Sequence, residues 1–216
     1  MKQFRLMVFV LLLPLLAAAQ PYKEDIAAFR KQDSLQAPAK GQILFIGSSS
    51  FTRRTDVQAY FPGYPILNRA FGGSTLLNQL LWINEVVFPY DPKQIVIYCG
   101  ENDFAENDSL YPAQVAERFM QLFDQIRARY KNVPILYVSM KPSPSRAHLM
   151  AKFNVANVMI KYFLKKKRRA RFIDVYHKML GPDGAPLKNI FGPDNLHMNA
   201  AGYAIWQKAI APYLLK

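Results

Sequence analysis

Short apolar runs, each closed by glycine or polar residues, alternate along the chain with longer stretches in which apolar positions recur every three to four residues. The short runs have the length of buried strands, and the longer stretches have the period of helices that bury one face. Strands are predicted at residues 42–46, 66–67, 95–99, 135–138 and 172–175. Because strands that alternate with helices form a parallel sheet covered on both faces, we expect an α/β fold: a three-layer α/β/α sandwich around a five-stranded parallel sheet.

The helical stretches fall between these runs. A short amphipathic helix is expected around Ile26 and Phe29, and a long helix begins near Pro112, since Pro is well placed in a first helical turn. The remaining helices are expected at residues 57–61, 76–87, 153–164 and 203–214, with a Gly/Pro-rich loop at 180–198.

The first nineteen residues have the pattern of a secretory signal peptide. Lys2 and Arg5 precede an apolar run at residues 6–16, and the small residues 17–19 follow it. We expect cleavage before Gln20 and an exported protein, periplasmic or extracellular. Eleven apolar residues are too few to span a bilayer, so stable membrane insertion is not expected. This divides the chain into a signal peptide at 1–19, an arm at 20–40 and one domain at 41–216.

The chain is strongly basic. Its formal charge is +13, and without Lys2 and Arg5 it is still +11, from 26 basic and 15 acidic residues. Such a charge favours anionic surfaces and anionic polymers. The basic run at 165–171 is interpreted as the solvated end of a helix, where cations suit the helix dipole. Since no nucleic-acid-binding motif accompanies it, a nucleic-acid partner is not expected.

Cys99 is the only cysteine, so the chain has no internal disulfide. It lies inside an apolar run, where a buried and inert thiol is expected.

Polar signals follow three of the predicted strands at the point where each strand ends. Ser49 follows the first, Ser74 follows the Gly72-Gly73 pair after the second, and residues 100–103 follow the third. The carboxyl ends of parallel strands meet at one edge of a sheet, which is where ligands bind in open α/β folds. The three turns are therefore expected to converge, with Ser49 as a candidate nucleophile.

A nucleophilic serine needs a base, and the chain has three histidines. His197 lies just before the last helix, and Asp194, three residues earlier, can hold one of its ring nitrogens. That leaves the other nitrogen free to accept the Ser49 proton. His148 and His177 are interpreted as surface or structural residues.

Acyl transfer also needs hydrogen-bond donors for an oxyanion. The backbone N–H of Ser49, the backbone N–H of Gly73 and the side-chain amide of Asn102 are the candidates. Gly73 and Asn102 could each also serve a local turn, but catalysis explains the set better. No histidine is paired with other ligands at metal spacing, so a metal site is not expected.

Four segments of the chain resemble the sequence blocks of the SGNH (GDSL-like) hydrolases. These are residues 47–50, 68–73, 100–103 and 194–197, with the sequences GSSS, NRAFGG, GEND and DNLH. They occur in the family's order, and the resemblance extends from residue 43 to about residue 210.

The resemblance implies a flavodoxin-like sheet and a serine esterase that needs no metal or other cofactor. The four matching blocks imply a role for each site residue: Ser49 as nucleophile, Gly73 and Asn102 as oxyanion donors, His197 as base and Asp194 as the residue that orients His197.

Two positions depart from the family pattern. Ser48 replaces the usual Asp before the nucleophile, and Ala70 replaces a usual Gly in the second block. Neither change removes a catalytic group. Phe51 occupies the last position of the Gly-x-Ser-x-Gly motif that α/β-hydrolases would require, which excludes that class.

We therefore expect an exported serine esterase that hydrolyses carboxylic esters through an acyl-enzyme. No long apolar lid is visible, which favours short acyl groups, such as acetyl on carbohydrate, in a small-molecule or glycan substrate. A lysophospholipase or acyl-lipid hydrolase and a sugar O-acyltransferase with the same residues are alternatives. A catalytically silent carbohydrate-binding module is the alternative from another class. The sequence does not indicate an oligomeric state.

Overall fold

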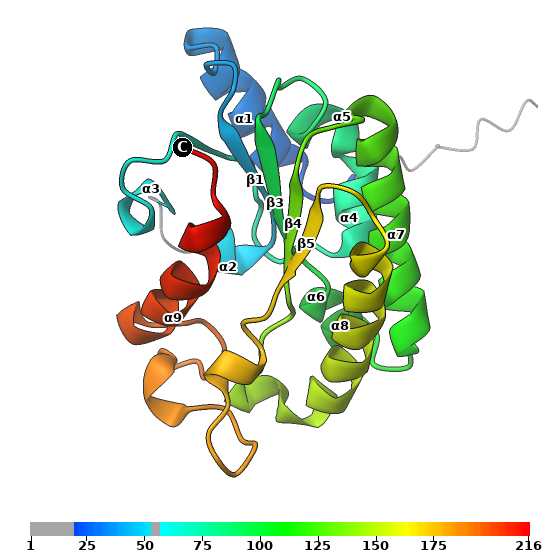
Figure 1. Cartoon of the computed structure of the whole chain (residues 1–216), viewed down its shortest axis with the longest axis vertical. Helices are drawn as coiled ribbons and strands as arrows, with labels where there is room; N and C mark the ends of the chain where they lie inside the picture. Colours follow the sequence, from blue (N-terminus) through cyan, green and yellow to red (C-terminus); the bar gives the residue numbers. More distant parts are fainter. Residues whose placement is uncertain (1–19, 53–56) are drawn as a thin grey trace, which may run out of the picture.

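A computed structural model describes residues 20–52 and 57–216, arranged as a sheet between two layers of helices (Figure 1). The strands are β1 (Ile43–Gly47), β2 (Ile66–Asn68), β3 (Gln94–Tyr98), β4 (Ile135–Val138) and β5 (Ala170–Ile173). All neighbouring strands pair in parallel, in the order β2-β1-β3-β4-β5. This is the flavodoxin-like order, so the predicted fold class is confirmed.

The central strands are buried on both faces, which explains their near-continuous apolar sequences. Every residue of β1, β3 and β4 is buried, and β1 lies against β3 from the Ile43–Gln94 pair to the Gly47–Tyr98 pair. The register therefore brings Gly47 beside Tyr98 at the carboxyl edge of the sheet.

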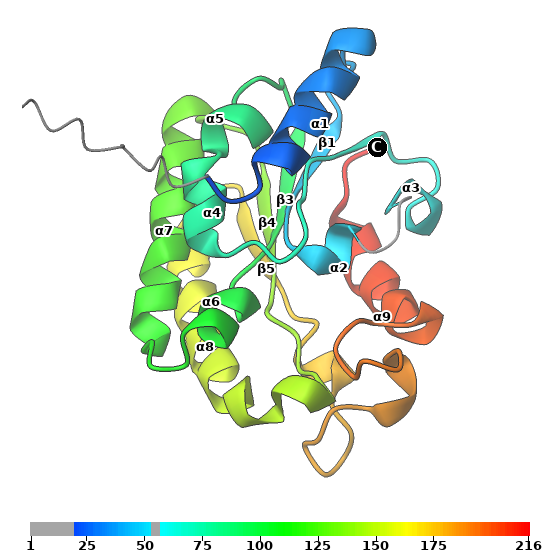
Figure 2. The same ribbon diagram turned by 180° about the vertical axis from the view of Figure 1, so that it is seen from behind.

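Helices cover both faces of the sheet (Figures 1 and 2). The larger layer contains α1 (Lys23–Leu35), α4 (Leu76–Leu81), α5 (Ile83–Val86), α6 (Glu101–Glu106), α7 (Pro112–Arg129) and α8 (Met150–Lys165). The smaller layer contains α2 (Ser49–Thr52), α3 (Val57–Tyr60) and α9 (Ala200–Ile210). Short 3₁₀ helices complete the elements of the described residues, at Pro144–Leu149, His177–Met179, Lys188–Ile190 and Ala211–Tyr213.

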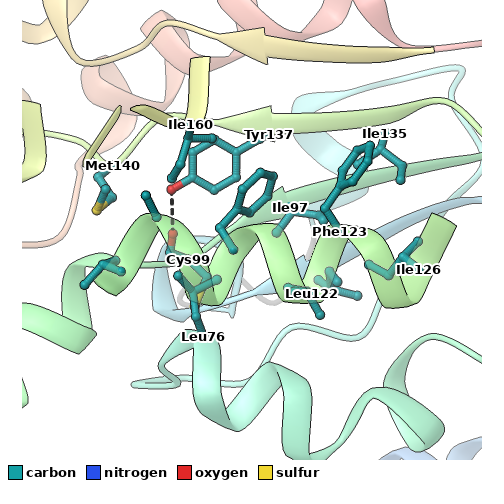
Figure 3. Close-up of a cluster of buried hydrophobic side chains, with 14 of the residues drawn as sticks. Leu76, Ile97, Cys99, Leu122, Phe123, Ile126, Ile135, Tyr137, Met140 and Ile160 are labelled. Carbon is teal, nitrogen blue, oxygen red and sulfur yellow. Dashed lines mark hydrogen bonds between the residues drawn. The ribbon is translucent and has the colours of Figure 1, made fainter. Parts of the chain in front are cut away.

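The core beneath α7 and α8 reaches the carboxyl edge of the sheet (Figure 3). The rings of Phe119 and Tyr137 lie 4.4 Å apart, and the Tyr137 hydroxyl donates a 2.8 Å hydrogen bond to the carbonyl of Cys99. Cys99 is buried, and burial raises the pKa of its thiol well above the ordinary value. The thiol therefore stays protonated, as expected of an inert core residue.

Several element boundaries differ from the expected ones. The fifth strand lies two residues earlier, at Ala170–Ile173. The helix expected at 76–87 is two helices that meet at Trp82, whose indole N–H donates to the carbonyl of Pro21. The last helix ends at Ile210, because Pro212 has no N–H with which to continue it.

The expected N-terminal arm, residues 20–40, contains α1, which packs onto the domain. Helix α1 inserts Ile26 into the core beneath the larger helical layer, where the residue is buried. The predicted signal peptide, residues 1–19, lies outside the described residues. Within the part of the chain that the structure describes, no helix has the length and apolar character needed to cross a bilayer.

We predict that Gly47→Ala destabilises the fold by about 3 kcal/mol or more. Gly47 has φ +130°, and a Cβ built there would lie 1.9 Å from the carbonyl oxygen of Tyr98. Backbone strain of about 1–3 kcal/mol would add to a steric cost of similar size. Urea unfolding measures the change.

Gly63→Ala is the matched control. Gly63 has φ +81°, but a Cβ there meets nothing within 4 Å, so this variant carries only the backbone strain. Equal losses of stability in the two variants would contradict the steric argument.

Candidate active site

The candidate nucleophile lies on a sharp turn between β1 and α2. Gly47 ends the strand in a conformation that favours glycine, the N–H of Ser48 donates to the carbonyl of Tyr98 at 2.9 Å, and α2 begins at Ser49. The first N–H groups of a helix have no partner within the helix, so the Ser49 N–H is available to an anion. The turn places the Ser49 side chain and N–H together at the carboxyl edge of the sheet.

The structure brings Ser49, His197 and Asp194 into one chain of hydrogen bonds. His197 Nε2 lies 3.0 Å from Ser49 Oγ, and His197 Nδ1 lies 2.6 Å from Asp194 Oδ2. The other Asp194 oxygen accepts the backbone N–H groups of Leu196 and His197. The hydrogen bond from His197, followed by the backbone N–H groups, holds the pKa of Asp194 well below its ordinary value. Asp194 therefore remains a carboxylate and fixes the ring so that Nε2 faces Ser49.

Helix α9 holds the histidine loop against the nucleophile turn, although His197 and Ser49 are far apart in sequence. The Tyr203 hydroxyl donates a 2.9 Å hydrogen bond to the carbonyl of Ser50. The ring of Trp206 packs edge-on against Tyr98, with 4.6 Å between ring centroids. The position of His197 thus depends on the packing of the final helix.

A second Asp-x-x-His pair shows that sequence spacing alone does not make a site. His177 Nδ1 lies 2.8 Å from Asp174 Oδ2, and the His177 N–H donates to the other carboxylate oxygen. This repeats the local geometry of Asp194 and His197. His177 is exposed, however, and it does not line the pocket that contains Ser49. His148 is also exposed, as expected of a surface residue.

Asn102 lies on α6 with its amide group close to the nucleophile turn. Its Nδ2 donates to Ser48 Oγ at 2.7 Å and to the Ser74 carbonyl at 3.1 Å. Its Oδ1 accepts a 2.8 Å hydrogen bond from Arg146 Nη2. An arginine can only donate, so this bond fixes the amide with its N–H groups toward Ser48.

Gly73 is the remaining expected donor. It lies on an exposed turn between β2 and α4 with φ +81°, and it is not among the described residues that line the pocket around Ser49. Its role as an oxyanion donor stays a prediction.

Sequence reasoning missed a buried charge cluster beside Asn102. Lys141 Nζ lies 3.2 Å and Arg146 Nη1 3.4 Å from Glu101 Oε2, while the other Glu101 oxygen accepts the Tyr98 hydroxyl and the Lys141 N–H. Burial by itself raises the pKa of Glu101, but the two cations outweigh it and the pKa is lowered. The available signal was position: the segment with Lys141 and Arg146 follows β4, so it lies at the same edge of the sheet.

The site residues line a small and mainly polar pocket, which in this conformation has room for about one water molecule. The lining residues are Ser48, Ser49, Tyr98, Cys99, Gly100, Glu101, Asn102, Lys141, Arg146, Leu196 and His197. Among the described residues, no group of three or more His, Cys, Asp or Glu side chains could hold a metal ion.

A flavodoxin-like sheet that carries a Ser-His-Asp hydrogen-bond chain at its carboxyl edge is an arrangement that suits a serine hydrolase. A sequence model of the GDSL-like Lipase/Acylhydrolase family matches residues 47–205. The chain belongs to this family and is a hydrolase that acts on esters. The resemblance noted in the sequence is therefore confirmed.

Solved structures show the same fold at low sequence identity. A Streptococcus pneumonia protein, provisionally described as a platelet activating factor, is 19% identical, with TM-score 0.77 over 89% of this chain and 92% of that one. A GDSL-like lipase from Bacteroides thetaiotaomicron is 20% identical, with TM-score 0.74 over 87% and 95%. A carbohydrate esterase family 3 protein from Talaromyces cellulolyticus is 14% identical, with TM-score 0.64 over 80% and 95%. No curated protein matches the sequence.

We predict that Asn102→Ala lowers kcat by roughly 10²–10³ with little change in KM, as expected for loss of one oxyanion donor.

Arg146→Ala should lower kcat by roughly 10- to 100-fold, since a hydrogen bond to a charged group contributes about 1.5–3 kcal/mol. Steady-state kinetics on a soluble ester measures both effects.

The double variant identifies how Arg146 acts. If Arg146 acts by orienting the Asn102 amide, Arg146→Ala should add little to the loss already caused by Asn102→Ala. Fully multiplied losses in the double variant would mean that Arg146 acts independently of Asn102.

We predict that protonation of Asp194 does not limit activity as the pH falls. The lowered pKa of Asp194 keeps its carboxylate charged, so an acidic limb in the pH–rate profile does not arise from this residue. His197→Ala should lower kcat by on the order of 10⁶, and Asp194→Asn by about 10⁴, because the latter leaves the base present but badly oriented.

A pH–rate series on these variants tests the prediction, with His177→Ala as the matched control. His177→Ala removes an equivalent Asp-x-x-His pair away from Ser49 and should retain wild-type activity. Substantial activity in His197→Ala would overturn the assignment of the base.

Proposed function

We propose that the protein is an exported serine esterase that hydrolyses carboxylic esters of short acyl groups, such as acetyl on carbohydrate, through an acyl-enzyme. The observation that carries the proposal is the continuous chain from Ser49 Oγ through His197 to Asp194, with distances of 3.0 and 2.6 Å.

The geometry supports the following reaction. His197 Nε2 accepts the Ser49 proton while Oγ attacks the ester carbonyl carbon, and the oxyanion forms beside the Ser49 N–H and the Asn102 amide. An oxyanion is a stronger acceptor than a hydroxyl, so it would replace Ser48 Oγ as a partner of Asn102. Collapse of this intermediate expels the alcohol, which takes the proton from His197. A water molecule that gives a proton to His197 then attacks the acyl-enzyme and releases the acid, and His197 returns the proton to Ser49.

Three observations support the choice of substrate and location. The pocket is small and mostly polar, which suits a short acyl group better than a long chain. One structural neighbour is described as a carbohydrate esterase. The basic start, apolar run and small residues at positions 1–19 have the order of a signal peptide, which supports export.

A panel of nitrophenyl esters of increasing acyl length tests the proposed substrate class. We expect kcat/KM to be highest for acetate and to fall as the chain lengthens, because the pocket around Ser49 is small. A maximum at long chains would favour an acyl-lipid hydrolase instead. Acyl transfer to an added sugar that outruns hydrolysis would favour an acyltransferase.

We predict that a fluorophosphonate probe labels Ser49 and no other residue. The wild-type and Ser48→Ala proteins should both be labelled, whereas Ser49→Ala should not, because only Ser49 Oγ contacts the base. Mass spectrometry of the adduct locates the modified residue. An adduct on Ser48 or Ser50 would refute the assignment, and an unlabelled wild-type protein would favour a binding module without turnover.

A further inference from the structure

Helix α8 has two apolar faces, and only one of them is covered. Its buried face contains Phe153, Ala156, Ile160 and Leu164, which pack on the sheet. Its opposite face exposes four large apolar side chains, with 50, 41, 36 and 65% of the surface accessible at Val155, Val158, Met159 and Tyr162. Ten large apolar side chains are exposed among the described residues, so one face of one helix holds four of them.

These four residues form a continuous stripe. Their spacing of three, four and seven residues places them on one side of the helix, and the next positions on that side are Lys165 and Lys166. Both lysines are exposed, as are Lys161 and Arg168. None of these four cations has an ion-pair partner among residues 20–52 and 57–216. We call this stripe and its four cations the α8 face.

The stretch of sequence that contains α8 carries charge of one sign, although Lys141 pairs with Glu101 and Lys167 pairs with Asp124. Between Asp124 and Asp174 the chain contains 13 lysine and arginine residues and no carboxylate. The net charge of this stretch, +13, is as large as the formal charge of the whole chain. Helix α8 lies on the outside of the larger helical layer, beside α7 (Figure 1).

We propose that the α8 face binds the surface of an anionic lipid bilayer. A helix with apolar residues on one exposed side and lysines along the same side lies in the plane of a membrane interface, with the apolar side chains inserted and the cations at the headgroups. Tyr162 suits the boundary between acyl chains and headgroups, where tyrosine is enriched. The binding is peripheral, because α8 is only 16 residues long and its other face is buried.

Charge and apolarity together favour this partner over two others. A second copy of the chain would bring two sets of unpaired cations toward each other, which costs energy. An anionic polymer would bind the cations but would not require the apolar stripe between them. The α8 face does not include the pocket residues, so the proposal is independent of the reaction catalysed.

Vesicle sedimentation tests the proposal, with vesicles of equal parts phosphatidylglycerol and phosphatidylcholine against vesicles of pure phosphatidylcholine. We expect binding to the anionic vesicles that weakens as salt is added, and little binding to the neutral ones. All variants share the N-terminus of the wild type, so any contribution of residues 1–19 is common to them. Ser49→Ala should bind as wild type does, which separates membrane binding from catalysis.

Two paired substitutions test the two components of the α8 face. Lys165→Gln/Lys166→Gln should weaken binding about 25-fold, because each cation near an anionic surface contributes about fivefold. Val158→Ser/Tyr162→Ser should weaken it about tenfold or more through loss of apolar burial.

Matched controls lie elsewhere on the surface. Lys188→Gln/Lys208→Gln removes the same charge, and Leu77→Ser/Leu81→Ser removes exposed apolar side chains on α4. Both controls should bind as the wild type does. Equal losses in the controls and the α8 variants would overturn the proposal, and so would binding that does not distinguish the two vesicle types.

Two further outcomes would assign the α8 face to another partner. Binding to soluble polyphosphate but not to vesicles, lost with the lysines and unaffected by the serine substitutions, would indicate an anionic polymer. Sedimentation velocity that shows a dimer dissociated by Val158→Ser/Tyr162→Ser would indicate a second copy. Either result would refute membrane binding.

Discussion

The close approach of β1 and β3 at their carboxyl ends is the constraint on which the site depends. A side chain at Gly47 would overlap the carbonyl of Tyr98, and that same carbonyl accepts the N–H of Ser48. Gly100 lies two residues after the end of β3, directly before α6, and its φ of +129° is almost the same as that of Gly47. Each glycine lets a strand turn at once into a helix, and the two helices begin at Ser49 and Glu101. Ser49 and the Asn102 amide are therefore neighbours because two paired strands are each followed by a glycine turn and a helix.

The Asn102 amide also depends on a set of buried charges of opposite sign that compensate one another. Glu101 is almost fully buried, and an unpaired carboxylate there would be strongly disfavoured. Lys141 and Arg146 supply the compensating charge, and Arg146 also contacts Asn102. Both cations belong to the segment after β4, so a third strand end contributes to the site. The carboxyl edge of the sheet thus provides both the candidate catalytic groups and the charges beside them.

The sequence allowed most of the fold to be predicted, together with most of the residues that the structure brings together at the candidate site, for identifiable physical reasons. Buried parallel strands are short apolar runs, which are visible in the sequence. Ser49 and Asn102 directly follow such runs, and His197 lies just before a helix, so each has a recognisable local pattern. The partners of Glu101 could not be read in this way, since Lys141 and Arg146 lie 40 and 45 residues away. Nor could spacing alone separate Asp194 and His197 from Asp174 and His177, which form the same local pair. Only the packing of α9 against the nucleophile turn distinguishes them.

The serine at position 48 gives Arg146 a particular importance in this chain. A carboxylate at this position, as in the usual family pattern, could only accept hydrogen bonds, and it would by itself draw the N–H groups of Asn102 toward it. A hydroxyl can donate or accept, so Ser48 would tolerate either orientation of the amide. Arg146 removes this ambiguity, because a guanidinium can bond only to the amide oxygen of Asn102. In the usual family pattern, the carboxylate before the nucleophile would fix the orientation of this amide. In this chain Arg146 fixes it instead, by donating to the amide oxygen of Asn102.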